Sequence, residues 1–255
     1  MPKKASTDNP HPTVNVASLA EQIAASLHKL RRWRTAEIRT VRRTFSRRLA
    51  EAEAQEVINL GLRVLDGPGS ASRFVAYELV CHHRAALRRL RAADLGRFGR
   101  GLDSWGAVDT FACYLAGPAW RERQVADSLI YRWARSPDRW WRRTALVCTV
   151  PLNNKTRGGA GDTPRTLAVC KLLVADRDDM VSKALSWALR ELAKRDAAAT
   201  RAFLDEYEDS LPARVIREVR NKLATGLKNP RKKPATRRHR FPAAHKARNP
   251  ARLSE

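Results

Sequence analysis

DDMVSKALSWALREL, residues 178–192, is the clearest guide to the fold class because it combines a helix start with a one-sided apolar pattern. Asp178 and Asp179 are of the type that opens a helix, since an acidic side chain binds free backbone amides and favours the positive end of the helix dipole. Apolar residues then recur at helical spacing, at Val181, Leu185, Ala188 and Leu192. The stretch therefore predicts an amphipathic helix that needs another element to cover its apolar side.

Comparable helical patterns occupy most of the chain. Ser18 and Glu21 have capping-box spacing and predict the start of the first helix. Further helices are predicted over 35–49, 51–65, 70–90 and 212–226, the last of them closing at Gly226. Ser136-Pro137 and Thr163-Pro164 each place a hydroxyl before a proline, which predicts two more helix starts.

The fold class follows from the number of these helices and from the lack of strand patterns. Ten or eleven helices joined by short turns predict an all-α stack of antiparallel pairs, either a right-angled array or a curved solenoid. No stretch alternates apolar and polar residues as strands do. The one long polar loop is predicted at 151–162, where Lys155 and Arg157 are candidates to reach a phosphate backbone. The alternative interpretation is that this loop only connects two helices at the surface.

The charge of the chain points to a polyanionic partner. Fifty Lys and Arg residues against 26 Asp and Glu give a formal net charge of +24. Residues 228–255 contain ten of the basic residues and one Glu, so the rest of the chain is strongly basic as well. Nucleic acid is the partner that such a balance favours.

Three regions are predicted. Residues 1–15 form a disordered N-terminus, 16–226 a helical repeat domain, and 227–255 a basic disordered tail. The tail either attracts nucleic acid without sequence preference or serves only as a solubilising extension.

The sequence contains no clear motif for a metal site, a cofactor or a membrane segment. The four cysteines are widely spaced within apolar helical patterns, which predicts buried, reduced thiols. His82 and His83 are adjacent, so their rings point in different directions on a helix and do not form a metal pair. No phosphate-loop or dinucleotide-binding motif occurs, and no cofactor is expected. The N-terminus lacks the apolar segment of a signal peptide, so we expect a cytoplasmic protein that does not bind membranes.

One segment combines an aromatic residue with a carboxylate. Trp105 and Asp109 are four residues apart and therefore neighbours on one helix face. A different stripe is apolar and contains Val108, Phe111 and Leu115. An indole face beside a carboxylate suits a cationic ligand. The alternative is a helix-start acid next to a packing tryptophan.

Two further clusters join basic residues with tryptophan. Trp140-Trp141-Arg142-Arg143 follows a predicted helix start, where a guanidinium can hold a phosphate with two hydrogen bonds. Trp187 lies on a basic helix with Lys183 and Arg190. Such aromatic residues can stack on bases, although any one of them alone is more often a packing residue.

In this order and spacing, the segments resemble the DNA alkylation repair glycosylases of the AlkD type. The resemblance covers roughly residues 20–225 and rests on Asp103-Ser104-Trp105 with Asp109, on Trp140-Trp141-Arg142-Arg143, and on Val181-Ser182-Lys183-Ala184 with Trp187. It implies HEAT-like helical repeats that form a curved solenoid with a concave basic face. It also implies hydrolysis of the N-glycosidic bond of cationic N3- or N7-alkylated purines in double-stranded DNA.

The resemblance assigns roles to particular residues. The catalytic carboxylate would be Asp109, its paired tryptophan Trp105, and the active-site arginine Arg143 in preference to Arg142. Gly106 departs from the pattern, where a larger or acidic residue is expected. The residues expected to contact DNA are Trp187, Arg142, Trp141, Lys183, Arg190, Lys155 and Arg157.

A second class of function stays open. The same helical stack could bind DNA or unusual DNA structures without hydrolysing anything, or act as an RNA or protein scaffold. A carboxylate on a surface that meets a polyanion favours the enzyme. We expect a monomer without an obligate protein partner, associated with the nucleoid while it acts on DNA.

Overall fold

The computed structural model describes residues 15–32 and 34–230, and within these ranges the chain forms helices and no strand. The helices are α1 (Val16–His28), α2 (Thr35–Arg48), α3 (Ala54–Leu65), α4 (Gly69–His82), α5 (Arg84–Arg89), α6 (Ala92–Phe98), α7 (Trp105–Phe111), α8 (Gly117–Arg121), α9 (Asp127–Ala134), α10 (Arg139–Val147), α11 (Val150–Asn153), α12 (Thr163–Leu172), α13 (Asp179–Leu192), α14 (Ala197–Glu206) and α15 (Ala213–Thr225), with a π-helix η1 (Ala112–Ala116) and a 3₁₀-helix η2 (Lys155–Arg157). None of these described helices is long and apolar enough to cross a membrane.

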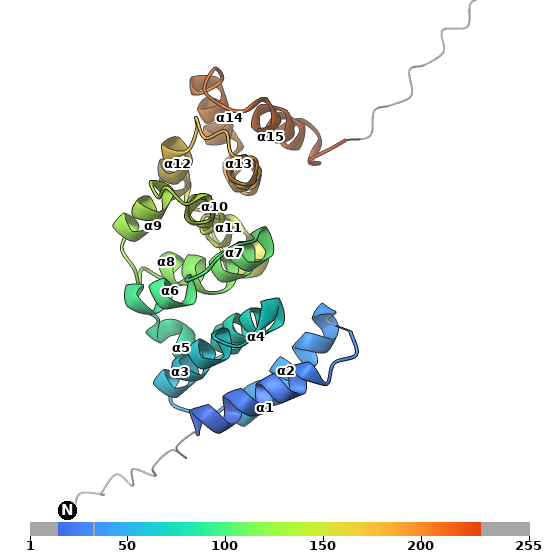
Figure 1. The fold of residues 1–255 in the computed structure, drawn as a ribbon. Helices are drawn as coiled ribbons and strands as arrows, with labels where there is room; N and C mark the ends of the chain where they lie inside the picture. The colour runs from blue at the N-terminus through green and yellow to red at the C-terminus, as the bar shows by residue number, and fades with distance from the viewer. Residues whose placement is uncertain (1–14, 33, 231–255) are drawn as a thin grey trace, which may run out of the picture.

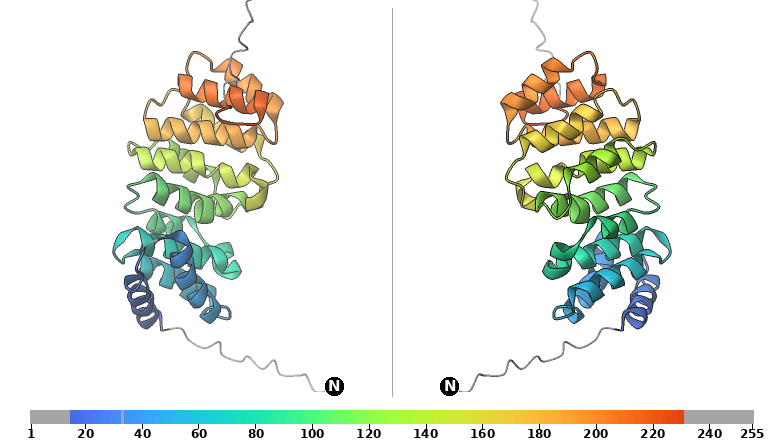
Figure 2. Two further views of the ribbon diagram at one scale, coloured as in Figure 1. Left: turned by 90° about the vertical axis from the view of Figure 1, so that its right-hand side faces the viewer. Right: turned by 90° about the vertical axis from the view of Figure 1, so that its left-hand side faces the viewer.

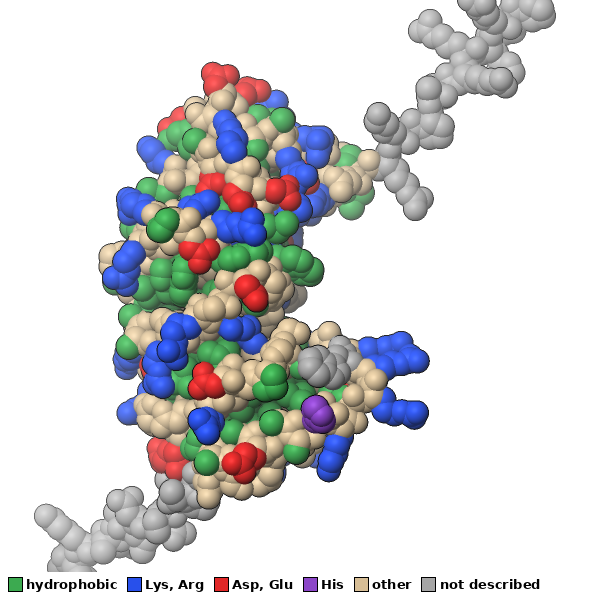
Figure 3. Space-filling view, in the orientation of Figure 1, with side chains coloured by type: hydrophobic (Ala, Val, Ile, Leu, Met, Phe, Trp, Pro, Cys, Tyr) green, Lys and Arg blue, Asp and Glu red, His purple; other side chains and the backbone are tan. Residues whose placement is uncertain are grey.

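The helices lie in two rows that run the length of the molecule (Figure 1). An inner row is formed by α2, α4, α7, α10, α13 and α15, which pack one after another, and α1, α3, α6, α9 and α12 lie outside it. Figure 2 shows the successive layers from the sides. The inner row lines the hollow side of the curved stack, which opens to the right in Figure 3. The predicted all-α solenoid with a concave face is confirmed.

The apolar stripe of 178–192 explains why the layers stack. Val181, Leu185, Ala188 and Leu192 are all fully buried, as predicted. Helix α13 packs against α10 on one side and α15 on the other. Burial of each large aliphatic side chain contributes about 1.5–3 kcal/mol, so each layer is stabilised mainly by its neighbours.

Several helix starts differ from the prediction. Helix α1 is capped by Asn15, whose side chain accepts from the Ser18 amide. In the same way Asp138 caps α10 by accepting from the Trp140 amide, and Asp162 caps α12 by accepting from the Arg165 amide. The predicted hydroxyl caps at Ser18, Ser136 and Thr163 were therefore wrong. In each case a nearby Asn or Asp provides the oxygen that reaches the free amide. Asp178 is confirmed as the cap of α13.

The helices are also shorter and more numerous than predicted. The single helix expected over 70–90 is divided at His83, whose ring nitrogen accepts from the Ala86 amide and so caps a new helix, α5. The predicted loop 151–162 contains α11 and η2. The break at His83 was missed because a capping side chain lies inside a helical pattern. Helices α11 and η2 were missed because elements this short have no periodic signal in the sequence.

Other predictions have mixed outcomes. All four cysteines are unpaired; Cys113, Cys148 and Cys170 are buried, whereas Cys81 is only half-buried. The predicted disordered ends, 1–15 and 227–255, lie mostly outside the described residues, and their disorder stays a prediction.

Gly99, which follows α6, makes room for a tryptophan and supports a stability prediction. A Cβ at this position would lie 2.2 Å from the Trp141 ring. We expect Gly99→Ala to lower the free energy of unfolding by about 1–3 kcal/mol, because the half-buried Trp141 must shift from its packing against the core. Urea unfolding measures the effect. The matched control is Gly96→Ala on the same helix, where a Cβ meets nothing within 4 Å and alanine should stabilise the helix. Equal stabilities of the two variants would contradict the prediction.

Candidate active site

A buried Arg143 and a half-buried Asp109 form an ion pair between two helices of the inner row. The Arg143 Nε donates to one carboxylate oxygen of Asp109 at 3.0 Å, and Nη2 donates to the other at 2.9 Å. The third nitrogen, Nη1, donates to the backbone carbonyl of Met180 on α13 at 2.6 Å. Three successive inner helices therefore position one carboxylate. Of the two candidate arginines, Arg143 is the one that meets Asp109, and its role in an active site stays a prediction.

The carboxylate keeps access to solvent and free lone pairs. The Asp109 side chain is 20% exposed, whereas that of Arg143 is 6% exposed. A carboxylate has about four lone-pair sites, and two hydrogen bonds from a guanidinium leave the others available. Asp109 can therefore accept a further hydrogen bond or stabilise a nearby cation without leaving Arg143.

Burial changes the protonation of this group. It raises the pKa of the Asp109 carboxyl above its usual range, and the hydrogen bond and charge of Arg143 oppose this rise without cancelling it. The site therefore contains a carboxylate that takes up a proton at a higher pH than an exposed aspartate does.

Trp105 is the exposed member of the site. It is the first residue of α7, one turn before Asp109, and it is 61% exposed. The residues of the adjacent apolar stripe, Val108, Phe111 and Leu115, are fully buried as predicted. An exposed indole one turn from a carboxylate offers an aromatic face that a cationic ligand can contact.

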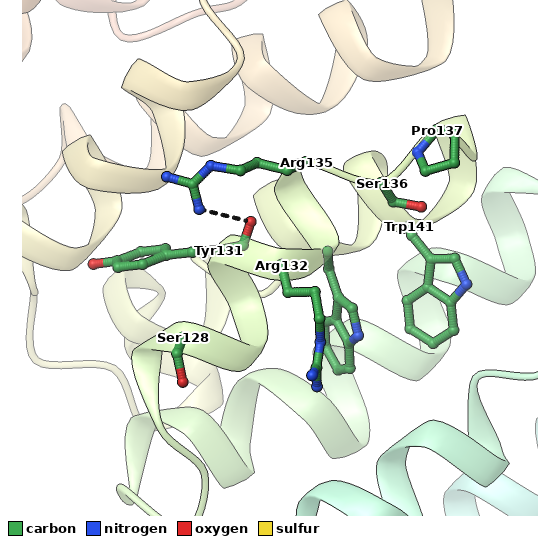
Figure 4. Close-up of a pocket in the computed structure, with 8 residues that line it drawn as sticks. Ser128, Tyr131, Arg132, Arg135, Ser136, Pro137 and Trp141 are labelled. Atoms are coloured by element: carbon green, nitrogen blue, oxygen red, sulfur yellow. Dashed lines mark hydrogen bonds between the residues drawn. The ribbon is translucent and has the colours of Figure 1, made fainter.

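Arg142 and Trp141 contact groups other than Asp109. Arg142 binds Asp176 at 2.7 Å and donates to two backbone carbonyls, so its guanidinium is largely occupied. Trp141 packs against Trp133 with ring centroids 4.9 Å apart. It lines a cavity of about 660 Å³ on α9 together with Arg132 (Figure 4). Both residues therefore lie outside the immediate surroundings of the Asp109–Arg143 pair, and their contact with DNA stays a prediction.

The predicted DNA-binding residues of α13 share one helical stripe with Met180. Lys183 is exposed and pairs with Asp179 at 2.7 Å. Trp187 is half-buried and packs against the core. Arg190, also half-buried, donates to Ser186 at 3.2 Å. Because Met180 contacts Arg143, this stripe runs from the ion pair along α13, and Trp187 lies about 10 Å farther along the helix axis.

Lys155 and Arg157, the two basic residues predicted to lie in a loop, differ in exposure. Lys155 is exposed, whereas Arg157 is half-buried with its guanidinium 5.3 Å from the centre of the Tyr114 ring. Sequence reasoning missed Tyr114 and the Met180 carbonyl. Neither carries a signal of its own in the sequence, since a backbone carbonyl is present at every residue and tyrosine is common in helices.

The fold and site together define an all-helical solenoid with a partly exposed carboxylate, a buried guanidinium paired with it, and an exposed tryptophan on its inner row. Residues 19–223 match the family model described as DNA alkylation repair enzyme. The match covers most of the chain, and the protein belongs to this family. A comparison with curated proteins found no match.

Proposed function

We propose that this protein is a monofunctional DNA glycosylase that hydrolyses the N-glycosidic bond of cationic N3- or N7-alkylated purines in duplex DNA. The observation that carries the proposal is the pairing of a partly exposed Asp109 carboxylate with a largely exposed Trp105 one turn away. Membership of the DNA alkylation repair family supports the same chemistry.

The chemistry needs no strong acid. An alkylated purine already carries a positive charge and leaves as a neutral base, so the rate depends on stabilising the cationic sugar that forms. Asp109 would stabilise that charge and orient the attacking water through its free lone pairs. Trp105 would lie against the sugar or the cationic base.

Arg143 would act mainly on Asp109. Two of its nitrogens bind the carboxylate and the third binds the Met180 carbonyl, so the guanidinium fixes the orientation of Asp109. Its remaining N–H groups are the ones available to a DNA phosphate. Phosphate binding, which the sequence suggests for a guanidinium of the Trp140–Arg143 cluster, is therefore proposed for Arg143 as secondary to positioning.

Release of free base tests the proposal. Duplex DNA treated with a methylating agent is incubated with the protein and with buffer alone, and released 3-methyladenine and 7-methylguanine are quantified. Release above the blank supports a glycosylase. Tight duplex binding without release favours the second candidate, a non-catalytic DNA-binding protein, in which the Asp109–Arg143 pair only joins two helices.

The raised pKa of Asp109 gives a pH prediction. We expect base release to decline as the pH falls, with a midpoint above the ordinary aspartate value of about 3.9, because the protonated carboxyl cannot stabilise a cation. Single-turnover rates on DNA containing 7-methylguanine measure the profile after subtraction of acid-catalysed release in buffer. The residual activity of Asp109→Asn should lack this step. A rate that stays constant down to the ordinary value would contradict the assignment.

A further inference from the structure

A second cavity, of about 490 Å³, lies between α2, α4, η1, α8 and η2. Four arginines and one acidic residue are among the residues that line it: Arg39, Arg42, Arg121, Arg157 and Glu78. We refer to it as the arginine cavity. None of these residues belongs to the Asp109–Arg143 pair.

Glu78 neutralises only part of this charge. Its side chain is 1% exposed and binds Arg39 at 2.8 Å and Arg42 at 3.2 Å. Two guanidinium groups thus share one carboxylate. Arg121 pairs with Glu122, which is largely exposed and does not line the cavity. The arginine cavity therefore has an excess of positive charge, which an anion would balance.

Arg157 has no anionic partner in the described part of the chain. Its guanidinium lies over the Tyr114 ring, and no carboxylate within residues 15–32 and 34–230 pairs with it. The Tyr114 hydroxyl accepts a hydrogen bond from Arg39 at 3.1 Å, so its own hydrogen is available to a ligand. Guanidinium groups and a hydroxyl donor are the groups that bind phosphate oxygens.

The arginine cavity adjoins the candidate active site. Cys113, which lines it, follows Asp109 by four residues, or about one helical turn. Both residues belong to the α7–η1 segment of the inner row. A DNA strand has one phosphate per about 3.4 Å of helix axis, so a duplex whose lesion faced Asp109 would have phosphates within reach of the arginine cavity.

We propose that the arginine cavity binds a phosphate group and that, if the proposed function is right, this group is a backbone phosphate of the DNA duplex bound at Asp109. Arg157 and Tyr114 are the residues that would contact it. Arg39 and Arg42 would supply charge while they keep Glu78 neutralised.

Binding of an undamaged duplex at several salt concentrations tests the proposal without depending on base release. We expect Arg157→Gln to weaken binding about tenfold near 0.1 M salt, the order of one charge-assisted contact, and to reduce the salt slope by about 1. Tyr114→Phe should weaken binding less and leave the slope unchanged, because no charge is removed. The matched control, Arg201→Gln, removes the same charge from an exposed position on α14 and should change neither quantity.

A second titration separates the two sources of phosphate. Inorganic phosphate is titrated into the wild type and Arg157→Gln by calorimetry. Weaker duplex binding with a flatter salt slope in Arg157→Gln supports a backbone phosphate, even in a protein that releases no base. Unchanged duplex binding, with inorganic phosphate bound only by the wild type, would overturn the DNA part and leave a free-phosphate site. No change in either measurement would overturn the whole proposal.

Discussion

Replacing Asp109 with asparagine is expected to lower the rate of base release by about 100-fold or more, the order of loss when one group that stabilises transition-state charge is removed. Asparagine keeps the shape of the side chain but carries no charge, and its amide nitrogen faces a guanidinium that can only donate. The measurement is single-turnover release of 7-methylguanine from duplex DNA at saturating protein.

Measuring the affinity of Asp109→Asn for DNA shows whether a lower rate of base release comes from lost catalysis or from lost binding. Asp109→Asn removes a negative charge from a surface expected to meet DNA, so affinity for undamaged duplex should stay the same or rise. Asp205→Asn, which removes the same charge from an exposed position on α14, is the matched control and should release base at the wild-type rate. A wild-type rate in Asp109→Asn would leave the Asp109–Arg143 pair as a purely structural link.

The second large effect concerns stability. We expect Arg143→Met to lower the free energy of unfolding by about 3 kcal/mol, because it leaves a largely buried carboxylate without its cation and the Met180 carbonyl without its donor. Base release should be lost as well, since nothing then orients Asp109. Urea unfolding gives the stability, and the base-release assay gives the rate.

A double variant shows whether the unpaired charge causes the loss. Arg143→Met combined with Asp109→Asn removes both charges, so part of the stability should return while activity stays low. Arg139→Met on the same helix is the control, because Arg139 is exposed and lies 3.6 Å from its partner Asp178, so this pair should contribute less than about 1 kcal/mol. A double variant no more stable than Arg143→Met alone would contradict the charge explanation.

Local information was enough for the helical class and for half of the site. Residues four apart in a helix share a face, and the spacing of Trp105 and Asp109 therefore placed them together before any fold was known. The apolar stripe Val108, Phe111 and Leu115 followed from the same periodicity and is fully buried. These predictions depend on neighbours along the chain and need no tertiary contact.

The choice between Arg143 and Arg142 cannot be made from local spacing, because adjacent helical residues point about 100° apart. Which one meets Asp109 depends on how α10 is rotated against α7. The close fit of Trp141 against Gly99 accompanies the observed rotation, in which Arg143 reaches a carboxylate 34 residues earlier. Periodicity alone cannot supply that angle.

An all-helical, basic chain with a tryptophan and a carboxylate on one helix face can thus be predicted without a structure, since these properties depend on composition and spacing. The pairing of Arg143 with Asp109 cannot, and neither can the position of Arg39 and Arg157 in one cavity, because these residues are far apart in the chain. Such contacts arise from the packing of separate helices, and side-chain spacing along the chain does not encode them.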